Sequence, residues 1–220
     1  MKAAIVIPAH NESPTIGHLV TAVSMFGTPI VVDDGSSDGT GEIATAAGAV
    51  VVTLDRNRGY DMALERGFHE ASNLGADIAV TFDADGQHDP KSLPAFVDPL
   101  ARNAADLVVG VRPESARFME ALFNCYTRIR YGVPDILCGL KGYRMELYRH
   151  HGCFDSSRSI GTELTLAALR QGKRVVTVPV NICEREGSSR LGGSLRANLK
   201  IFRAMLIGIG RDLLPQTRKL

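Results

Sequence analysis

Two aspartates near the middle of the chain, Asp83 and Asp85, have the residue type and spacing of a metal-binding pair. They end residues 77–82, an apolar run rich in Ile, Val, Thr and Phe, which predicts a buried strand. Carboxylates in that position need a partner, and Mg²⁺ or Mn²⁺ accepts oxygen ligands and also binds substrate phosphates. The alternative is an acidic surface turn, because Asp and Gly are common turn residues.

The elements that position this pair alternate between strands and helices. Apolar runs predict strands at residues 3–7, 29–32, 49–54, 77–82, 105–111 and 174–180. Helical patterns follow Ser13, the expected N-cap of a helix with Ile16, Leu19, Val20 and Val23 on one face, and recur before Ala47 and over 59–74 (Met62, Phe68, Ala71), 93–100 and 162–171. This alternation predicts an α/β fold with a mostly parallel central sheet flanked by helices.

Carboxylates end three of the first four predicted strands. Asp33 and Asp34 follow the second strand, Asp55 follows the third, and Asp83 and Asp85 follow the fourth. In open α/β sheets, ligands bind beyond the carboxyl ends of the strands. We therefore expect a polar ligand site at this edge. No G-x-G-x-x-G follows the first strand and no G-x-x-x-x-G-K-[ST] is present, which disfavours dinucleotide and P-loop phosphate binding.

Charge is unevenly distributed along the chain. Residues 1–110 carry 6 Lys and Arg against 15 Asp and Glu, residues 111–184 carry 11 against 7, and residues 185–220 carry 8 against 2. The acidic first half suits a cation, and the basic end suits phosphates or an anionic membrane surface. The alternative is a solvated charged face. We expect no nucleic-acid partner.

Composition indicates a soluble globular protein. With 220 residues, 45% apolar and 22% charged, the chain can bury one substantial core. Its four cysteines are widely spaced and form no CxxC pair, which favours reduced thiols over zinc or disulfides. The N-terminal apolar stretch is too short for a signal peptide, and no run approaches the roughly 18 apolar residues of a membrane span. We expect a cytoplasmic protein, with peripheral contact at the cytoplasmic face of the membrane as an alternative.

Three segments in this order resemble the signatures of family 2 glycosyltransferases, which have the GT-A fold. They are Ile-Pro-Ala-His-Asn-Glu at 7–12, Val-Val-Asp-Asp-Gly-Ser-Ser-Asp-Gly-Thr at 31–40 and Asp-Ala-Asp-Gly-Gln-His at 83–88. The resemblance covers residues 1–190. It implies a catalytic domain over 1–193, with a nucleotide-binding half (1–110) and an acceptor half (111–193), followed by a helical tail (194–220).

Within this family the chain is most similar to polyprenyl-phosphate sugar transferases. That subgroup has its own motifs where this chain has Asn57-Arg58-Gly59, Gly110-Val111-Arg112 and residues 138–144 and 185–191. Two positions depart from the pattern: Lys-Gly-Tyr-Arg at 141–144 replaces Ser-Gly-Phe-Arg, and Arg190 stands where lysine is usual. Both departures concern the acceptor more than the chemistry.

The resemblance implies an inverting, metal-dependent transfer of one sugar from a nucleoside diphosphate sugar to polyprenyl phosphate. The implied nucleotide contacts are Pro8, Asn11, Glu12, Asp33, Asp34, Asp61, Asp83 and Ala84, and the implied ligands of Mg²⁺ or Mn²⁺ are Asp83, Asp85 and Gln87. His88 is the alternative third ligand. Asp33 and Asp34 could instead form an Asx-type turn, and Asp61 could serve only the helix dipole.

The acceptor decides whether a catalytic base is needed. A polyprenyl phosphate is already an anion, and Arg112, Arg117, Arg185 and Arg190 are the candidate contacts for its phosphate. Asp85 and Arg185 are the implied catalytic residues. If the acceptor is instead a soluble or glycan hydroxyl, Glu163 is the candidate base and Asp155 a weaker one. Without the Gln-x-x-Arg-Trp signature of processive members, and with no tryptophan at all, we expect a single transfer.

Other classes of function remain open from the sequence. A sugar nucleotidyltransferase is disfavoured because its glycine-rich phosphate loop is missing, and a non-catalytic nucleotide-binding protein is a further alternative.

Residues 194–214 predict an amphipathic helix with Leu195, Leu199, Phe202, Met205, Leu206 and Ile209 on one side. That helix suits an anionic membrane surface, and it equally suits packing on the domain or in a homodimer.

Overall fold

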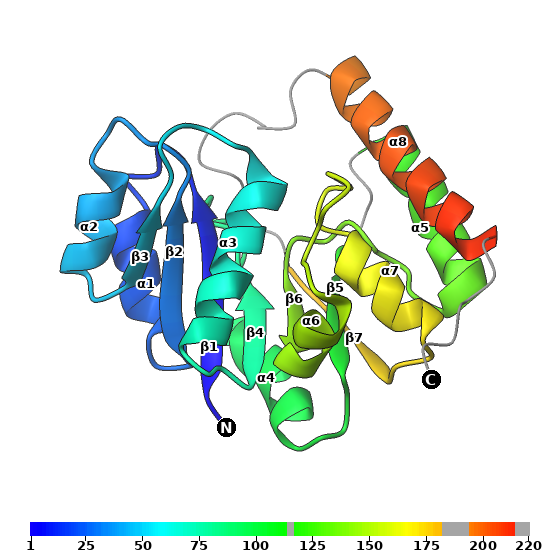
Figure 1. Cartoon of the computed structure of the whole chain (residues 1–220), viewed down its shortest axis with the longest axis horizontal. Helices are drawn as coiled ribbons and strands as arrows, with labels where there is room; N and C mark the ends of the chain where they lie inside the picture. The colour runs from blue at the N-terminus through cyan, green and yellow to red at the C-terminus, as the bar shows by residue number, and fades with distance from the viewer. Residues whose placement is uncertain (114–116, 182–193, 214–220) are drawn as a thin grey trace.

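The computed structural model describes residues 1–113, 117–181 and 194–213, in which a central sheet lies between helices (Figure 1). The strands of these residues form one sheet in the order β3-β2-β1-β4-β6-β5-β7. Their bounds are β1 (Ala3–Ala9), β2 (Thr28–Asp33), β3 (Val50–Thr53), β4 (Ile78–Thr81), β5 (Leu107–Val111), β6 (Lys141–Arg144) and β7 (Val175–Pro179). Neighbouring strands are parallel except where β6 runs antiparallel to β4 and β5. The mostly parallel α/β sheet confirms the prediction.

Strand β6 joins the two groups of parallel strands at the middle of the sheet. Its first residue, Lys141, lies opposite Thr81 of β4 and Val109 of β5. The Thr81 hydroxyl donates to the Gly139 carbonyl over 2.6 Å and accepts from the Lys141 backbone N–H over 3.1 Å. Because β6 is antiparallel, it begins at the edge where its parallel neighbours end. The segment before β6 therefore lies beside the loop that follows β4.

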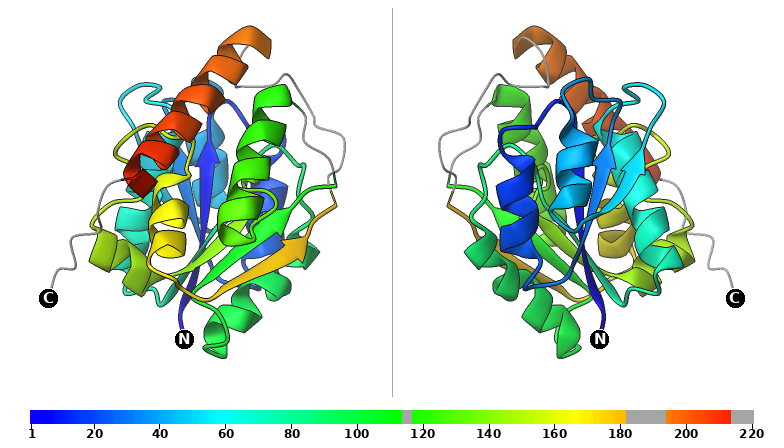
Figure 2. Two further views of the ribbon diagram at one scale, coloured as in Figure 1. Left: turned by 90° about the vertical axis from the view of Figure 1, so that its right-hand side faces the viewer. Right: turned by 90° about the vertical axis from the view of Figure 1, so that its left-hand side faces the viewer.

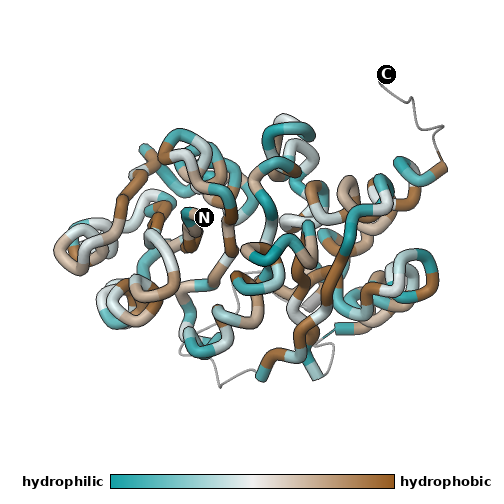
Figure 3. The backbone as a smooth tube through the Cα atoms, turned by 90° about the horizontal axis from the view of Figure 1, so that it is seen from below, coloured by the Kyte–Doolittle hydropathy of each residue, from teal (hydrophilic) through white to brown (hydrophobic). Residues whose placement is uncertain are grey.

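Helices cover both faces of the sheet (Figure 2). One face packs against α1 (Ile16–Val23), α2 (Thr40–Ala46) and α4 (Leu93–Ala101), which follows the 3₁₀ turn η1 (Pro90–Ser92). The other side holds α3 (Tyr60–Asn73), α5 (Phe118–Tyr131), α6 (Met145–His151), α7 (Glu163–Arg170) and α8 (Ser194–Leu213). Ile5 and Ile7 of β1 face the first group while Ala4 and Val6 face the second, as strand alternation requires. Figure 3 shows hydrophobic and hydrophilic stretches mixed along the helices.

The structure corrects several local expectations. Helix α1 begins after Thr15 rather than after Ser13, although its predicted face of Ile16, Leu19, Val20 and Val23 is buried. Met62 is 43% exposed, while Phe68 and Ala71 are buried as expected. The helices α5 and α6 and the strand β6 were not predicted, because no uninterrupted apolar run or cap signal marks them.

Helix α8 packs on α5 and α7 through Ala197, Ile201, Ala204 and Met205, all of them buried. The predicted apolar side is thus divided, since Met205 is buried whereas Leu195 is 87% exposed. Ala197 and Ala204 let the helix approach the domain closely, Ile201 and Met205 fill the contact, and Leu195, Leu199, Phe202 and Leu206 stay exposed. No helix among the described residues has the length and apolar content needed to span a membrane.

Candidate active site

Asp83 and Asp85 lie in the loop after β4, at the edge of the sheet where the parallel strands end. The Tyr60 hydroxyl donates to Oδ1 of Asp83 over 3.2 Å, and desolvation of this hydroxyl together with the Asp83 charge raises the pKa of Tyr60 well above its usual value, so that the hydroxyl keeps its proton. Gly139 lies against the same carboxylate, since a Cβ there would be 2.0 Å from Oδ2 of Asp83. Asp85 is 8% exposed, and its Oδ1 accepts from the Gln87 backbone N–H over 3.2 Å. Both carboxylates are therefore positioned by the surrounding loops.

The donor set of this loop fits a divalent cation. It combines the carboxylates of Asp83 and Asp85 with the amide of Gln87 and the imidazole of His88. The His88 ring is buried near Phe82, with 6.0 Å between ring centroids, and its Nδ1 has no hydrogen-bond partner among the described residues. Mg²⁺ and Mn²⁺ accept carboxylate and carbonyl oxygens, and Mn²⁺ also accepts imidazole nitrogen. Gln87 stays the predicted third ligand, and the unpartnered nitrogen gives the His88 alternative a structural basis.

The loop after β1 lies beside the loop after β4 and the loop after β2. Asn11 adopts a left-handed φ of 53°, and its backbone N–H donates to the Ser36 hydroxyl over 2.9 Å. The Thr15 hydroxyl donates to the Ala84 carbonyl over 2.9 Å and lies 3.4 Å from Oε2 of Glu12. Three predicted nucleotide contacts, Asn11, Glu12 and Ala84, thus belong to neighbouring loops.

Asp33 and Asp34 each support the backbone of a loop. Oδ1 of Asp33 accepts from the Ser36 N–H over 2.9 Å, which is the Asx-type contact that the sequence left open. The two carboxylate oxygens of Asp34 accept from the backbone N–H groups of Arg58, over 2.6 Å, and Gly59, over 2.8 Å. Their role in binding the base or ribose stays a prediction.

Buried charges connect α3, β6 and the loop before α7. Lys141 is 4% exposed and its Nζ donates to the Gly161 carbonyl over 3.1 Å, while Oδ1 of Asp61 accepts from the Gly161 N–H over 2.8 Å. Burial lowers the pKa of Lys141 to about 8. Burial, helped by the neighbouring Asp155 carboxylate, raises the pKa of Asp61 to about 6. Both backbone polar groups of Gly161 are therefore held by ionisable side chains, the carbonyl by Lys141 and the N–H by Asp61.

Glu163, the candidate base, is surrounded by hydrogen-bond donors. Its carboxylate accepts from the backbone N–H groups of Ser156 and Ser157, each over 2.9 Å, and lies 2.8 Å from Nη1 of Arg211. Burial would raise its pKa, but hydrogen bonds from the side chains of His151, Ser157, Arg211 and Ser156 outweigh burial and hold the pKa of Glu163 well below its usual range. Such a carboxylate is a poor proton acceptor at neutral pH.

A second group of metal-ligand types includes this same glutamate. Ligand atoms of His151, Cys153 and Glu163 lie within 4.8 Å of one another. The Arg211 guanidinium already neutralises the carboxylate, and it would repel a cation bound there. The metal site at Asp83 and Asp85 stays a prediction.

The predicted acceptor arginines that the structure describes are already paired with acids. Nε of Arg112 donates to Asp135 over 2.7 Å, and its guanidinium lies 3.4 Å from Glu120. Nη1 of Arg117 donates to Glu120 over 2.8 Å. Both arginines reach a phosphate only by sharing their donors with these acids. Arg185 and Arg190 lie outside the described residues.

The structure brings most of the predicted residues to one edge. The predicted nucleotide residues on or beside the ends of β1, β2 and β4 and the start of α3 are Pro8, Asn11, Glu12, Asp33, Asp34, Asp61, Asp83 and Ala84. Sequence reasoning missed Tyr60, Gly139 and Lys141 as neighbours of this site. Gly139 and Lys141 belong to a quoted motif, so a signal was present, but their positions depend on the unpredicted strand β6.

Comparison with known proteins identifies the family. The sequence profile described as "Glycosyl transferase family 2" matches residues 4–152. The chain belongs to glycosyl transferase family 2. It is therefore an enzyme that transfers a sugar, and the non-catalytic alternative is set aside.

Relatives agree with this assignment over nearly the whole chain. The chain is 34% identical to an undecaprenyl-phosphate mannosyltransferase of Micrococcus luteus, covering 89% of each protein. It is 31% identical to a polyprenol monophosphomannose synthase of Mycolicibacterium smegmatis, covering 88% of this chain and 82% of the relative. This glycosyltransferase is thus similar to polyprenyl-phosphate sugar transferases, as the sequence motifs indicate.

The fold also matches solved glycosyltransferases. Glucosyl-3-phosphoglycerate synthase from Mycobacterium tuberculosis, in complex with Mn²⁺ and uridine-diphosphate-glucose, superposes with a TM-score of 0.77 at 22% identity. The match covers 98% of this chain and 80% of that protein. The GT-A fold expected from the sequence is confirmed.

Proposed function

We propose that this glycosyltransferase moves one sugar from a nucleoside diphosphate sugar to a polyprenyl phosphate, with inversion at the anomeric carbon. The names of the relatives from Micrococcus luteus and Mycolicibacterium smegmatis support a polyprenyl phosphate acceptor. The Mn²⁺ and uridine-diphosphate-glucose bound to the solved glycosyltransferase support a nucleotide-sugar donor and a divalent cation.

The hydrogen-bond donors around the Glu163 carboxylate are the observation that favours a phosphate acceptor over a hydroxyl acceptor. A hydroxyl acceptor must lose a proton as it attacks, and a positioned base accelerates that step. A phosphate oxygen already carries negative charge at neutral pH and attacks without a base. Because its donors hold the pKa of Glu163 well below its usual range, this residue suits an enzyme whose acceptor needs no deprotonation.

The donor end is built from the loops after β1, β2 and β4. Asp83 and Asp85, with Gln87, would hold Mg²⁺ or Mn²⁺, and the bound cation would neutralise the diphosphate and stabilise it as a leaving group. Tyr60 keeps the Asp83 carboxylate oriented through its hydrogen bond. Asn11, Glu12, Asp33 and Asp34 border the space for the nucleotide.

In the proposed reaction, an oxygen of the polyprenyl phosphate forms a bond to the anomeric carbon from the face opposite the leaving group. The bond from that carbon to the diphosphate oxygen breaks, and the nucleoside diphosphate leaves with the electron pair. Arginines suit the binding of the acceptor phosphate because their forked donors match its oxygens. Arg185 and Arg190 are the proposed contacts, and Arg112 and Arg117 contribute while shared with Asp135 and Glu120.

The substitution Glu163→Gln tests the acceptor class. Nucleoside diphosphate sugars are supplied with Mn²⁺ and a short-chain polyprenyl phosphate, and the lipid-linked sugar is measured. We expect Glu163→Gln to keep more than about a tenth of the wild-type kcat, because an anionic acceptor needs no base. The kcat of Asp85→Asn should fall by at least about a hundredfold, because the substitution removes a carboxylate from the proposed metal site.

Thermal unfolding confirms that each variant is folded, and Asp98→Asn, on the exposed side of α4, is the matched control for loss of one carboxylate. A folded Glu163→Gln variant as inactive as Asp85→Asn would favour the hydroxyl acceptor with Glu163 as base. Full activity of Asp85→Asn would refute the metal site.

A further inference from the structure

Large apolar side chains are concentrated on the outer surfaces of two helices. Of the 14 large hydrophobic residues that are strongly exposed among the described residues, 8 lie on α5 and α8. We define the α5/α8 face by these residues: Phe118, Leu122, Ile129, Leu195, Leu199, Phe202, Leu206 and Leu213. Their exposed fractions run from 39% for Phe202 to 87% for Leu195. Apolar surface on this scale marks an interaction site on a soluble protein.

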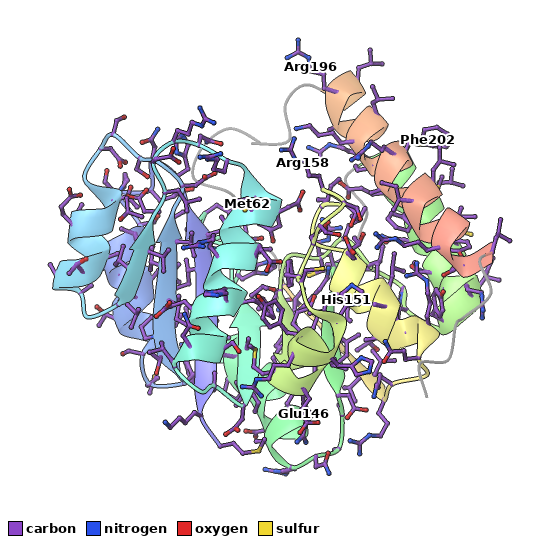
Figure 4. All side chains as sticks on the ribbon, in the orientation of Figure 1. Met62, Glu146, His151, Arg158, Arg196 and Phe202 are labelled. Carbon is purple, nitrogen blue, oxygen red and sulfur yellow. The ribbon has the colours of Figure 1, made fainter. Side chains whose placement is uncertain are left out.

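The two helices lie side by side on one side of the molecule, as Figure 2 shows in its left panel. The Met119 N–H near the start of α5 donates to Oδ1 of Asn198 near the start of α8 over 3.4 Å. Towards their ends, the Tyr126 hydroxyl donates to Asp212. The helices therefore run in the same direction, and each buries one side against the domain while its exposed apolar residues face solvent. Phe202 points away from the domain in Figure 4.

Among the described residues of α5 and α8, the exposed charged side chains are all basic. They are Arg128, Arg130, Arg196, Lys200 and Arg203. The carboxylates of these helices lie inside: Glu120 is 2% exposed and pairs with Arg112 and Arg117, and the Asp212 side chain is 6% exposed and pairs with Arg170. Among the described side chains of α5 and α8, apolar and cationic groups thus meet solvent without an exposed carboxylate.

This charge pattern distinguishes between two possible binding partners of the α5/α8 face, a second copy of the chain and an anionic bilayer. A second copy of the chain docked through the same face would bring two sets of cations together and offer them no acid. A bilayer with anionic lipids offers phosphates for the cations and an acyl boundary for the apolar side chains, which is how amphipathic helices bind membranes. We propose that the α5/α8 face docks onto an anionic bilayer surface.

Helix α8 also contacts the loop that precedes α7. Nη1 of Arg203 donates to the Arg158 carbonyl over 3.1 Å, and Arg158 belongs to the loop that leads to Gly161. Figure 4 places Arg158 between Met62 of α3 and the helix α8. The inference deepens the proposed function, since a polyprenyl phosphate is held in a membrane, but it is tested by binding alone.

Vesicle flotation with the full chain measures docking directly. The vesicles are phosphatidylcholine with 30% phosphatidylglycerol, and pure phosphatidylcholine, each at about 0.1 M salt. We expect binding to the anionic vesicles only. The double variant Leu199→Ser/Phe202→Ser and the charge variant Arg196→Glu/Lys200→Glu should each lower the partition coefficient by about tenfold or more. All four side chains are exposed, so the fold should be retained.

The variant Met25→Ser is the matched control, because Met25 is 79% exposed but lies beyond α1. The proposal is overturned if wild type fails to float with anionic vesicles, if the face variants float as wild type does, or if Met25→Ser loses as much binding. Self-association on light scattering that the face variants abolish, with no vesicle binding, would replace the bilayer with a second copy. Turnover on a short-chain polyprenyl phosphate without vesicles is measured in parallel, so that failure of docking and failure of the proposed function are separate results.

Discussion

Gly139 shows how one residue without a side chain constrains the proposed metal site. Its Cα lies so close to Asp83 that a Cβ would meet Oδ2 at 2.0 Å, while no positive φ requires glycine there. The constraint therefore comes from the carboxylate and not from the backbone of Gly139. Because the carboxylate is the movable end of a side chain, a larger residue would displace it rather than unfold the protein.

We predict that Gly139→Ala reduces turnover at least about a hundredfold while changing the free energy of unfolding by less than about 1 kcal/mol. A shift of about an ångström in a catalytic group is enough for such a loss. Turnover is measured across a Mn²⁺ titration, and unfolding by urea. The matched control is Gly210→Ala on α8, where a Cβ meets nothing within 4 Å. Equal turnover in both variants would show that the position of Asp83 does not depend on Gly139.

At the scale of elements, the loop between α6 and α7 combines strained backbone with firm anchoring. Arg158 and Ile160 adopt φ values of 53° and 57°, a region unfavourable for residues with a Cβ and most of all for a β-branched one. The Asp155 carboxylate accepts from the backbone N–H groups of Ser159 and Gly161, over 3.0 and 2.9 Å, which keeps the loop in place. Strain of this kind persists only where surrounding contacts outweigh it.

Replacement of Arg158 tests this strain. The side chain is exposed, so Arg158→Gly relieves the left-handed backbone without removing packing. We predict that the Gly variant is more stable than Arg158→Ala by about 1 kcal/mol, measured by urea unfolding. Lys200 is an exposed position inside α8 and serves as the comparison. There, Lys200→Gly should be less stable than Lys200→Ala by about 1 kcal/mol, because glycine weakens a helix. If the Gly variant were less stable than the Ala variant at both positions, the backbone at Arg158 would not be strained.

The same elements show what sequence could predict and what it could not. The strands β1 to β4 alternate with helices in continuous apolar runs, so their order and acidic ends were predictable, including Asp83 and Asp85. Strand β6 is only Lys-Gly-Tyr-Arg, which has neither an apolar run nor a strand-forming composition. Its place between β4 and β5 is a tertiary result. The neutralisation of Glu163 by Arg211 likewise joins residues far apart in sequence, and no local pattern encodes it.

For the whole molecule, buried charge makes stability depend on pH. Burial raises the pKa of Asp61 to about 6 from an ordinary value of 3.8, so the folded protein binds this proton more tightly than the unfolded chain does. The stabilisation from Asp61 is therefore complete below about pH 4 and is lost as pH rises through 6. Above this range the ionised carboxylate opposes folding.

We predict that Asp61→Asn becomes more stable relative to wild type as pH rises from 4 to 7, by about 2–3 kcal/mol in total. Asparagine keeps an oxygen for the Gly161 N–H but does not ionise. Urea unfolding at each pH provides the measurement, and the range stops below the pKa of about 8 of Lys141, which is also buried. Asp98→Asn, an exposed carboxylate, is the control and should change stability by less than about 0.5 kcal/mol throughout. A constant difference for Asp61→Asn would show that its proton is not linked to folding.

The central position of β6 has a mechanical consequence for the enzyme. Backbone hydrogen bonds connect every pair of neighbouring strands from β3 to β7. The part that would hold the nucleotide and the part that would hold the acceptor therefore belong to one continuous sheet. A hinge between these two parts would have to break the backbone hydrogen bonds that β6 makes with a neighbouring strand. Motions that admit substrates and release products are therefore confined to the loops along the rim of the sheet, and the span between donor and acceptor is built in when the chain folds.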